Sequence, residues 1–446
     1  MGGSEQAATG SPLEQWGCST VSFDARAGTS LWQNRSFRRF FAGQFVTNAG
    51  DSLYTVAVLW LVFEMSGSSF LTGIASAILL LPWLLQILAG PVVDRMPLKR
   101  LLIGSQLLQG TVIVVLPLAA ATDRLTVPVL FAVIPVLTFA RIVMFPMQPA
   151  LLPRIVDDDQ LADANSALAT VTLGLDMLFD AASGIIIGLF GAVVLFVIDS
   201  ATFAIAALLF AGVRIPPSTA SNATGGPVLR SYLDDLRAGF ETLQGTVFVE
   251  LVLLAAVFNL AVGITLAILP AFGSLLGGVM AYGFLLGALG IGRLAGSVLA
   301  PSLEGIAFGR LLLVGYAFGA GCWLTAVFVD SPMLTVVLFG LVWIPAGAIG
   351  VLTSTLNQTL FPAYLLGRIS SIKGTAAGAT LPLGSLLGGG LASVLGTTTT
   401  MGITASGFGF GALYVLTSPR LRRLPAVSDA EPSDFDITIR GAENVE

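Results

Sequence analysis

The chain has 446 residues, of which 55% are hydrophobic and only 11% charged, and its formal net charge is −5 at pH 7. Because a soluble domain carries about 25% charged residues, this composition excludes an ordinary soluble protein, and we expect no nucleic-acid partner. Histidine is absent and only two cysteines occur, so zinc, haem and iron–sulfur sites are excluded, and we expect neither a metal nor a cofactor.

Twelve apolar stretches follow one another, each long enough for the roughly 20 residues that a helix needs to cross a bilayer. A polar interval at about 214–245 divides them into two sets of six, and Pro153 after the fourth stretch is echoed by Pro362 after the tenth. The fold class predicted is an all-α membrane protein with twelve transmembrane helices in two pseudo-symmetric six-helix halves. The expected spans are 40–64, 70–93, 100–121, 127–150, 164–187, 190–213, 247–272, 279–303, 308–329, 333–356, 371–396 and 399–418.

The segments around these spans complete the predicted organisation. Residues 1–34 are expected to form a disordered cytoplasmic tail, 35–214 the first six-helix half and 247–418 the second. The connector 215–246 begins with small polar residues and then becomes amphipathic, which predicts a helix lying on the inner membrane surface. Residues 419–446 end in a run rich in acids, and we expect them to be disordered and solvated.

Basic residues determine the expected orientation. If both termini lie in the cytoplasm, the outer loops hold Arg124 as their only base, whereas the inner segments hold a long series of arginines and lysines. The positive-inside rule then favours this topology. We expect a multi-pass protein of the cell (plasma or cytoplasmic) membrane with both termini in the cytoplasm.

The loop between the second and third spans carries the first recognisable motif, Gly-Pro-Val-Val-Asp-Arg-Met-Pro-Leu-Lys-Arg from residue 90 to residue 100. It resembles the signature Gly-x-x-x-Asp-Arg-x-Gly-Arg-Lys of the major facilitator superfamily, although Pro97 and Leu98 replace the usual Gly and Arg. The resemblance implies a loop that keeps the inner face closed when the carrier is open to the outside. Its residues, with Gly367 and Arg368 after span ten, form the expected gating set: Gly90, Asp94, Arg95, Lys99, Arg100, Gly367 and Arg368.

Shorter segments resemble the drug:proton antiporter branch that contains macrolide-efflux proteins and siderophore exporters. They are Asn48–Asp51, Trp60–Ser68, Pro146–Pro153 with Ala164–Ser166, Asp199–Phe203 and Gly367-Arg368. The resemblance covers about 35–420. Two features of many antiporters are missing: the Gly-Pro of span five, and the Gln-Gly pattern that follows a buried arginine, here Arg141, in span four.

Ionisable side chains inside the spans are the first candidate site residues, because a charge at mid-bilayer costs at least about 2.5–3.5 kcal/mol and normally faces a cavity or another charge. Asp51 and Arg141 lie at similar depths, about 16 and 13 Å from the inner ends of their spans. The superfamily places these spans next to each other, so the two side chains can pair. Such a pair is either a structural ion pair or part of proton coupling.

Two further acids and one base extend this set. Asp176 and Asp180 are spaced i, i+4 on one helix face, which makes either a candidate for carrying a proton. Arg293 in span eight matches Asp176 in depth, and we predict a contact between them that forms or breaks during transport. The alternative is that both line water in the central cavity. Asp199 is expected to make a structural hydrogen bond.

Side chains at mid-depth with amide, sulfur or aromatic groups are candidates to line the solute cavity. Packing against lipid or neighbouring helices is the alternative for most of them. The glycine-rich faces of spans eight and eleven suit helices that approach closely and slide against the other half. The candidate cavity residues are Asn48, Trp83, Met144, Phe145 and Trp343.

With the resemblance, these features predict a secondary active transporter that couples protons to the efflux of an organic, amphipathic solute (a drug, macrolide or siderophore-like compound) by alternating access. Its expected partners are that solute, protons and the lipid bilayer, and it is expected to function as a monomer. No catalysis is implied, and no phosphate-binding Gly-x-x-x-x-Gly-Lys-[Ser/Thr] loop is present. The alternatives are a proton-driven importer of a small metabolite and a non-transporting membrane sensor of the same fold.

Overall fold

A computed structural model describes residues 31–437, with gaps at 96, 143, 172–175, 217–243, 363–368 and 370–373. In this part of the chain nearly all regular structure is helical, and strand-like pairing is limited to one bridge between Ala307 and Ala426. The predicted amphipathic connector helix falls mostly within 217–243 and lies outside the described residues.

The helices fall into two consecutive sets. The first set comprises α1 (Arg35–Ser66), α2 (Ser69–Arg95), α3 (Leu98–Ile113), α4 (Val115–Ala121), α5 (Val127–Ile142), α6 (Met144–Ile155), α7 (Leu161–Ala169), α8 (Asp176–Phe190) and α9 (Val193–Ala211). The second set comprises α11 (Val247–Leu276), α12 (Val279–Leu303), α13 (Phe308–Phe328), α14 (Pro332–Leu360), α16 (Thr380–Leu395), α17 (Thr397–Thr417) and the short α18 (Pro419–Arg422).

Local sequence explains where α1 begins and ends. The Asn34 side chain accepts hydrogen bonds from the backbone N–H groups of Ser36 (2.9 Å) and Phe37 (3.1 Å), which satisfies donors that an uncapped helix leaves free. The helix ends at Gly67, whose φ of 61° is left-handed and suits glycine. Two residues later α2 starts, so the chain reverses direction in a tight turn.

Length and hydropathy divide the helices into the twelve spans that the sequence predicts. In the described part, nine helices, with α3 and α4 counted as one, are long and apolar enough to cross a bilayer. A tenth span is the pair α5 and α6, which bends by 41°. The remaining two are the shorter apolar helices Ser69–Pro82 and Leu178–Phe190. The predicted fold class of twelve transmembrane helices in two halves is confirmed.

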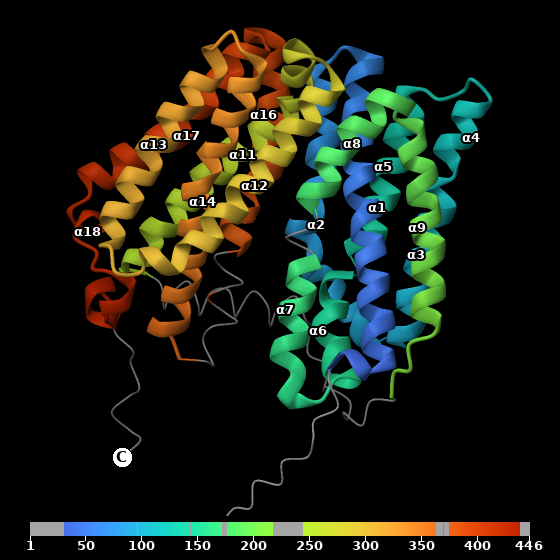
Figure 1. Cartoon of the computed structure of the whole chain (residues 1–446), viewed down its shortest axis with the longest axis horizontal. Helices are drawn as coiled ribbons and strands as arrows, with labels where there is room; N and C mark the ends of the chain where they lie inside the picture. Colours follow the sequence, from blue (N-terminus) through green and yellow to red (C-terminus); the bar gives the residue numbers. More distant parts are fainter. Residues whose placement is uncertain are drawn as a thin grey trace, which may run out of the picture.

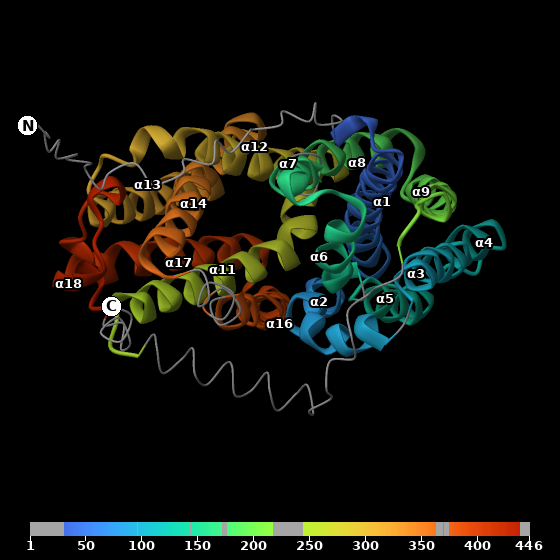
Figure 2. The ribbon, with the colours of Figure 1, turned by 90° about the horizontal axis from the view of Figure 1, so that it is seen from below.

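The two sets of helices form two bundles that stand side by side (Figure 1). In that view the helices of the first set, blue to green, occupy one side and those of the second set, yellow to red, the other. Seen from below, α2 lies next to α16 and α8 next to α12, so these pairs join the halves (Figure 2). We call the end of the molecule where α1 begins and α17 ends the terminal end, and the opposite end the far end.

The halves touch closely at the far end, where α2 and α12 begin and α8 and α16 end. A Cβ on Gly184 of α8 would lie 2.6 Å from the Cα of Gly283 of α12, so only glycine permits this approach. The hydroxyl oxygens of Ser76 in α2 and Ser385 in α16 are 3.1 Å apart and share a hydrogen bond. These four residues define the far-end seam.

The ends of the described chain differ from the predicted disordered tails. Leu31–Gln33 forms a 3-10 turn in which Leu31 is buried, and the ring of Trp32 contacts Phe37 and Phe41 edge-on. The expectation of a tail reaching to residue 34 is therefore too long by these residues. Aromatic contacts with the start of α1 hold them in place.

The larger correction concerns residues 419–437, whose apolar side chains pack against the second half while their acids stay exposed. Phe435 is fully buried and its ring lies 5.5 Å from that of Phe248 at the start of α11. Two of the acids have defined partners: Asp434 accepts a hydrogen bond from the backbone N–H of Glu431 (3.0 Å), and Asp436 pairs with Arg420 (3.7 Å). Paired acids and one buried ring explain why an acidic composition did not produce disorder.

Candidate functional site

A cavity of about 430 Å³ lies in the first half and reaches the second. We call it the polar cavity, because amide, hydroxyl and charged side chains line it together with leucines. From the second half its wall includes Leu266 of α11 and Tyr282 and Leu286 of α12. The polar residues on its wall are Gln44, Thr47, Asn48, Asp51, Ser52, Thr55, Ser76, Gln106, Gln109, Arg141, Gln148 and Asp180.

The structure brings Asp51 and Arg141 together on this wall. Nε of Arg141 on α5 lies 3.2 Å from Oδ2 of Asp51 on α1, and the Asp51 side chain is only 13% exposed whereas that of Arg141 is 37% exposed. The sequence placed Asp51 and Arg141 at similar depths in their spans, and the structure shows their side chains in contact. Because the pair is close and faces a cavity, a change in the charge of Asp51 alters what Arg141 is free to bind.

Helix α1 presents its polar side chains to the cavity at helical spacing. Asn48 donates a hydrogen bond to the carbonyl of Gln44 (2.7 Å), and the hydroxyl of Thr55 donates to the carbonyl of Asp51 (2.8 Å). These bonds satisfy donors within the helix itself, in a region with little water. Asn48, predicted as a cavity residue, therefore lines the cavity with its carbonyl oxygen available to a ligand.

Behind the ion pair lies a second acid, Asp199 of α9, which is fully buried. Its Oδ1 accepts a hydrogen bond from the hydroxyl of Thr202 (2.9 Å), the structural bond expected from the sequence. Its Oδ2 and the hydroxyl of Tyr54 have no hydrogen-bond partner in the described part of the chain. A Cβ on Gly50 would collide with Asp199 Oδ1 and with the Thr202 hydroxyl, so glycine lets α1 approach α9 here.

The other charged candidates separate into two regions. Asp180 of α8 lines the polar cavity, whereas the side chain of Asp176 lies outside the described residues. Arg293 lines a different cavity of about 280 Å³ in the second half, between α11, α12, α13, α14 and α17. Among the described residues Arg293 makes no ion pair, and its expected contact with Asp176 lies outside what the structure describes.

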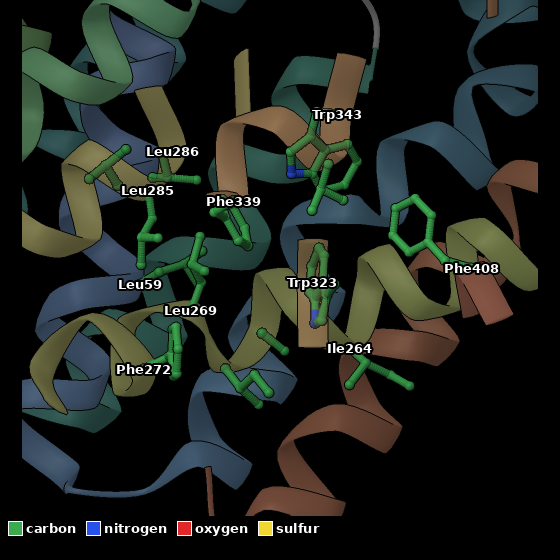
Figure 3. Close-up of a cluster of buried hydrophobic side chains, with 14 of the residues drawn as sticks. Leu59, Ile264, Leu269, Phe272, Leu285, Leu286, Trp323, Phe339, Trp343 and Phe408 are labelled. Atoms are coloured by element: carbon green, nitrogen blue, oxygen red, sulfur yellow. The ribbon is translucent and has the colours of Figure 1, made fainter. Parts of the chain in front are cut away.

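Of the predicted cavity residues with aromatic or sulfur side chains, some line a cavity and others do not. Met144 lines the polar cavity, and the hydroxyl of Ser105 lies 3.5 Å from its sulfur. Trp343 lines neither cavity: it is 2% exposed and packs against Trp323 and Phe339 in the hydrophobic core of the second half (Figure 3). A substrate contact for Trp343 is not available in this conformation. The side chains of Trp83 and Phe145 lie outside the described residues.

The predicted gating set is described only in part. Lys99 and Arg100 are exposed at the start of α3 at the terminal end. The backbone of Gly90, Asp94 and Arg95 belongs to the last turns of α2, and their side chains lie outside the described residues. Gly367 and Arg368 also lie outside them.

Sequence reasoning missed the amides that line the polar cavity. Gln106 and Gln109 of α3 are 1% and 2% exposed, and Gln106 Oε1 accepts a hydrogen bond from the Thr47 hydroxyl (3.0 Å). The available signal was their spacing of i, i+3 within an apolar span, which places two amides on the same side of a helix. Buried amides of this kind need polar partners, and a cavity supplies them.

The comparisons with known proteins fit this architecture. A family model described as "transmembrane secretion effector" (MFS_3, of the major facilitator superfamily) matches residues 27–437. The chain belongs to this family. It is a multi-pass membrane protein of the transporter class, and family and fold together indicate a non-enzymatic transporter.

Two relatives support the family at low identity. The multidrug efflux pump Tap of Mycolicibacterium fortuitum is 25% identical over 393 residues, which are 85% of this chain and 95% of Tap. The uncharacterized MFS-type transporter YfmI of Bacillus subtilis (strain 168) is 27% identical over 164 residues, 35% of this chain and 40% of YfmI.

Solved structures with this fold include two transporters. A bacterial homolog of the human lysosomal transporter Spinster, in an inward-facing and unoccupied conformation, has a TM-score of 0.67 at 13% identity, covering 88% of this chain and 98% of that one. The nucleoside transporter NupG has a TM-score of 0.67 at 12% identity, covering 87% and 98%. At these identities the likeness establishes the fold alone.

Proposed function

We propose that the protein exports an organic, amphipathic solute in exchange for protons by alternating access. The observation that carries this proposal is the Asp51–Arg141 ion pair, 3.2 Å apart on the wall of a cavity that both halves line. A charge pair inside a membrane is costly unless it stabilises the bundle or takes part in transport. Its position on an open cavity wall favours the second role.

The arrangement of the halves supports an inward-facing conformation. The far-end seam joins the halves at the end opposite the termini, through the Gly184–Gly283 approach and the Ser76–Ser385 hydrogen bond. The distribution of basic residues assigns the terminal end to the cytoplasm. In the outward-facing state the seam would open, and the gating set, including Lys99 and Arg100, would close the terminal end.

The coupling step follows from the charges on the cavity wall. When Asp51 is ionised, its carboxylate binds Arg141 or, in its place, a cationic group of the solute. When Asp51 binds a proton it loses its charge, and a cationic solute loses its partner on the cavity wall. Proton and solute thus compete for one charge, which is what an exchange mechanism requires.

The cavity wall also indicates the class of solute. Amides, hydroxyls and carboxylates line it together with the apolar side chains of Val56, Leu59, Leu79 and Leu286. A volume of about 430 Å³ lies within the range of pockets for drug-sized ligands. An amphipathic molecule satisfies both kinds of surface, and the relative Tap is a multidrug efflux pump, which supports export as the direction.

Purified protein in liposomes tests the proposal. Lipophilic cations, macrolides and siderophores are added in turn, and proton movement and solute movement are recorded together. We expect at least one compound to move with a counterflow of protons. Solute movement without any proton movement would contradict the coupling.

Intact cells test the direction of transport. A fluorescent substrate is followed before and after an uncoupler dissipates the proton gradient. For an exporter the uncoupler raises accumulation, and for a proton-driven importer it lowers accumulation. Cells that carry an empty vector control for passive entry.

A further inference from the structure

The cavity that contains Arg293 differs in character from the polar cavity. We call it the Arg293 cavity; it has a volume of about 280 Å³, and the described residues that line it all belong to the second half. Among these described residues Arg293 is the only charged one, and the hydroxyl groups come from Tyr316 and Thr353. Most of the remaining wall is apolar and includes Leu254, Phe258 and Phe408.

The position of Arg293 along α12 connects the two cavities. Tyr282 and Leu286 of α12 line the polar cavity, and Arg293 follows seven residues after Leu286. Seven residues correspond to nearly two helical turns and about 10 Å, so Leu286 and Arg293 lie on the same face of the helix. The two cavities thus lie along one face of α12.

The backbone of Arg293 packs closely against a neighbouring helix. A Cβ on Gly347 of α14 would collide with the carbonyl oxygen of Arg293, so α12 and α14 are in contact at this level. Among the described residues no carboxylate lies within ion-pair distance of Arg293. An arginine with an apolar surround and no paired acid is a site for an external anion, because its five donors match the oxygens of carboxylate, sulfonate and phosphate groups.

We infer that the Arg293 cavity binds an anionic amphiphile, with its acidic head on Arg293 and its chain against Leu254, Phe258 and Phe408. The cavity volume of about 280 Å³ lies just below the range of pockets for drug-sized ligands, so a single short alkyl chain suits it. A cationic amphiphile has no counter-charge on this wall and would be repelled by Arg293. This site goes beyond the proposed proton exchange, which uses the polar cavity.

The anionic head has two possible sources with the same chemistry. One is the exported solute itself, if it carries an acidic group. The other is an anionic lipid of the surrounding bilayer, whose head reaches the cavity between helices. Both predict binding that depends on Arg293, and competition experiments distinguish them.

The test measures binding to the full-length protein in a neutral maltoside detergent, without a proton gradient, so that its outcome is independent of proton coupling. The probe is decanoate with bromine at the chain end, which quenches nearby tryptophan fluorescence. Trp343 packs against Phe258 (5.8 Å between ring centroids) and Trp323 against Phe408 (5.7 Å), so both indoles lie one ring away from the cavity wall. The comparison probe is a brominated decyl trimethylammonium ion.

The expected result is saturable quenching by brominated decanoate and none by the cationic probe. Arg293→Gln should weaken decanoate binding by about 10- to 100-fold, the usual effect of losing hydrogen bonds to a charged group. Arg293→Lys should retain most of the binding because it keeps the charge. The matched control is Arg310→Gln at the exposed start of α13, which should bind like the wild type.

Equal affinity of wild type and Arg293→Gln would overturn the inference, and so would saturable binding of the cationic probe at the same site. Thermal unfolding of each variant, followed through tryptophan emission, shows that it is folded; if Arg293→Gln is not, Arg293→Ala and Arg293→Lys carry the same comparison. Displacement of the probe by phosphatidylglycerol assigns the site to lipid. Displacement by an acidic compound that the protein transports assigns it to the solute.

Discussion

The two halves of this transporter share a fold but bury charge in different ways. In the first half, Asp51 and Arg141 pair 3.2 Å apart on a wall of amides and hydroxyls. In the second half, Arg293 stands on a mostly apolar wall with no carboxylate partner among the described residues. The helices of the two halves correspond but their chemistry differs, and we propose that the first half provides a charge switch whereas the second binds an acidic amphiphile.

The largest expected effect comes from fixing the halves against each other. Ser76→Cys combined with Ser385→Cys places two thiols where hydroxyl oxygens are now 3.1 Å apart. Oxidation should cross-link α2 to α16, keep the far end closed and abolish transport, and reduction should restore it. The assay is solute transport in liposomes before and after a reductant. Full transport by the cross-linked protein would contradict movement at the far-end seam.

The second largest effect on transport is expected when Asp51 loses its negative charge, because this disables the proposed charge switch in the first half and leaves the second half unchanged. Asp51→Asn should reduce proton-driven transport to background, while exchange of labelled for unlabelled solute continues. The matched control is Asp123→Asn, an exposed aspartate with φ of 53°, a conformation that asparagine also tolerates. If exchange and proton-driven transport fall together, Asp51 serves binding or structure and not coupling.

Two glycine-to-alanine substitutions, one in each half, test whether the two cavities act separately. Gly50→Ala adds a methyl group that collides with Asp199 and Thr202 behind the ion pair, and Gly347→Ala adds one that collides with the backbone of Arg293. Each should destabilise the protein by about 1–3 kcal/mol, the usual cost of overpacking.

The two variants should differ in function. Gly50→Ala should impair proton flux and spare decanoate binding, and Gly347→Ala should do the reverse. Thermal unfolding, proton flux and probe binding are measured on the same preparations. The same functional loss in both variants would mean that the two cavities are not separate.

The smallest effects on transport concern the C-terminal segment, which belongs to the second half alone. Phe435→Ala removes a fully buried ring and should lower the stability of that segment by up to about 3–5 kcal/mol. Arg420→Gln loses ion pairs of an exposed side chain and should cost less than about 1 kcal/mol. Limited proteolysis of residues 419–437 provides the measurement. Equal cleavage rates for wild type and Phe435→Ala would show that the ring does not hold the segment.

The sequence predicted the fold well because span length and apolar composition follow directly from bilayer thickness. It also indicated Asp51 and Arg141, since charges inside a membrane are rare and their depths could be counted along the helix. Depth alone does not give rotation about the helix axis. Depth therefore could not show that Arg293 lines a cavity of the second half, and its expected contact with Asp176, whose side chain lies outside the described residues, stays a prediction.

Other features required tertiary contacts that composition does not reveal. Trp343 was a cavity candidate by depth, but it packs in an aromatic cluster with Trp323 and Phe339. The acidic end was expected to be disordered because acids repel, but Arg420 and the buried ring of Phe435 hold it to the bundle. Local charge counts cannot foresee such partners, which come from elements far away in the sequence.

The proposal that the first half couples protons and the second half binds an acidic ligand is tested most directly by proton flux. The flux triggered by a transported solute is recorded in liposomes for Asp51→Asn and Arg293→Gln side by side. We predict no proton flux for Asp51→Asn, even at saturating solute. For Arg293→Gln we predict flux with the wild-type ratio of protons to solute, although more of an acidic solute is needed to reach it. Normal proton flux in Asp51→Asn, or an altered proton ratio in Arg293→Gln, would contradict the assignment of coupling to the first half.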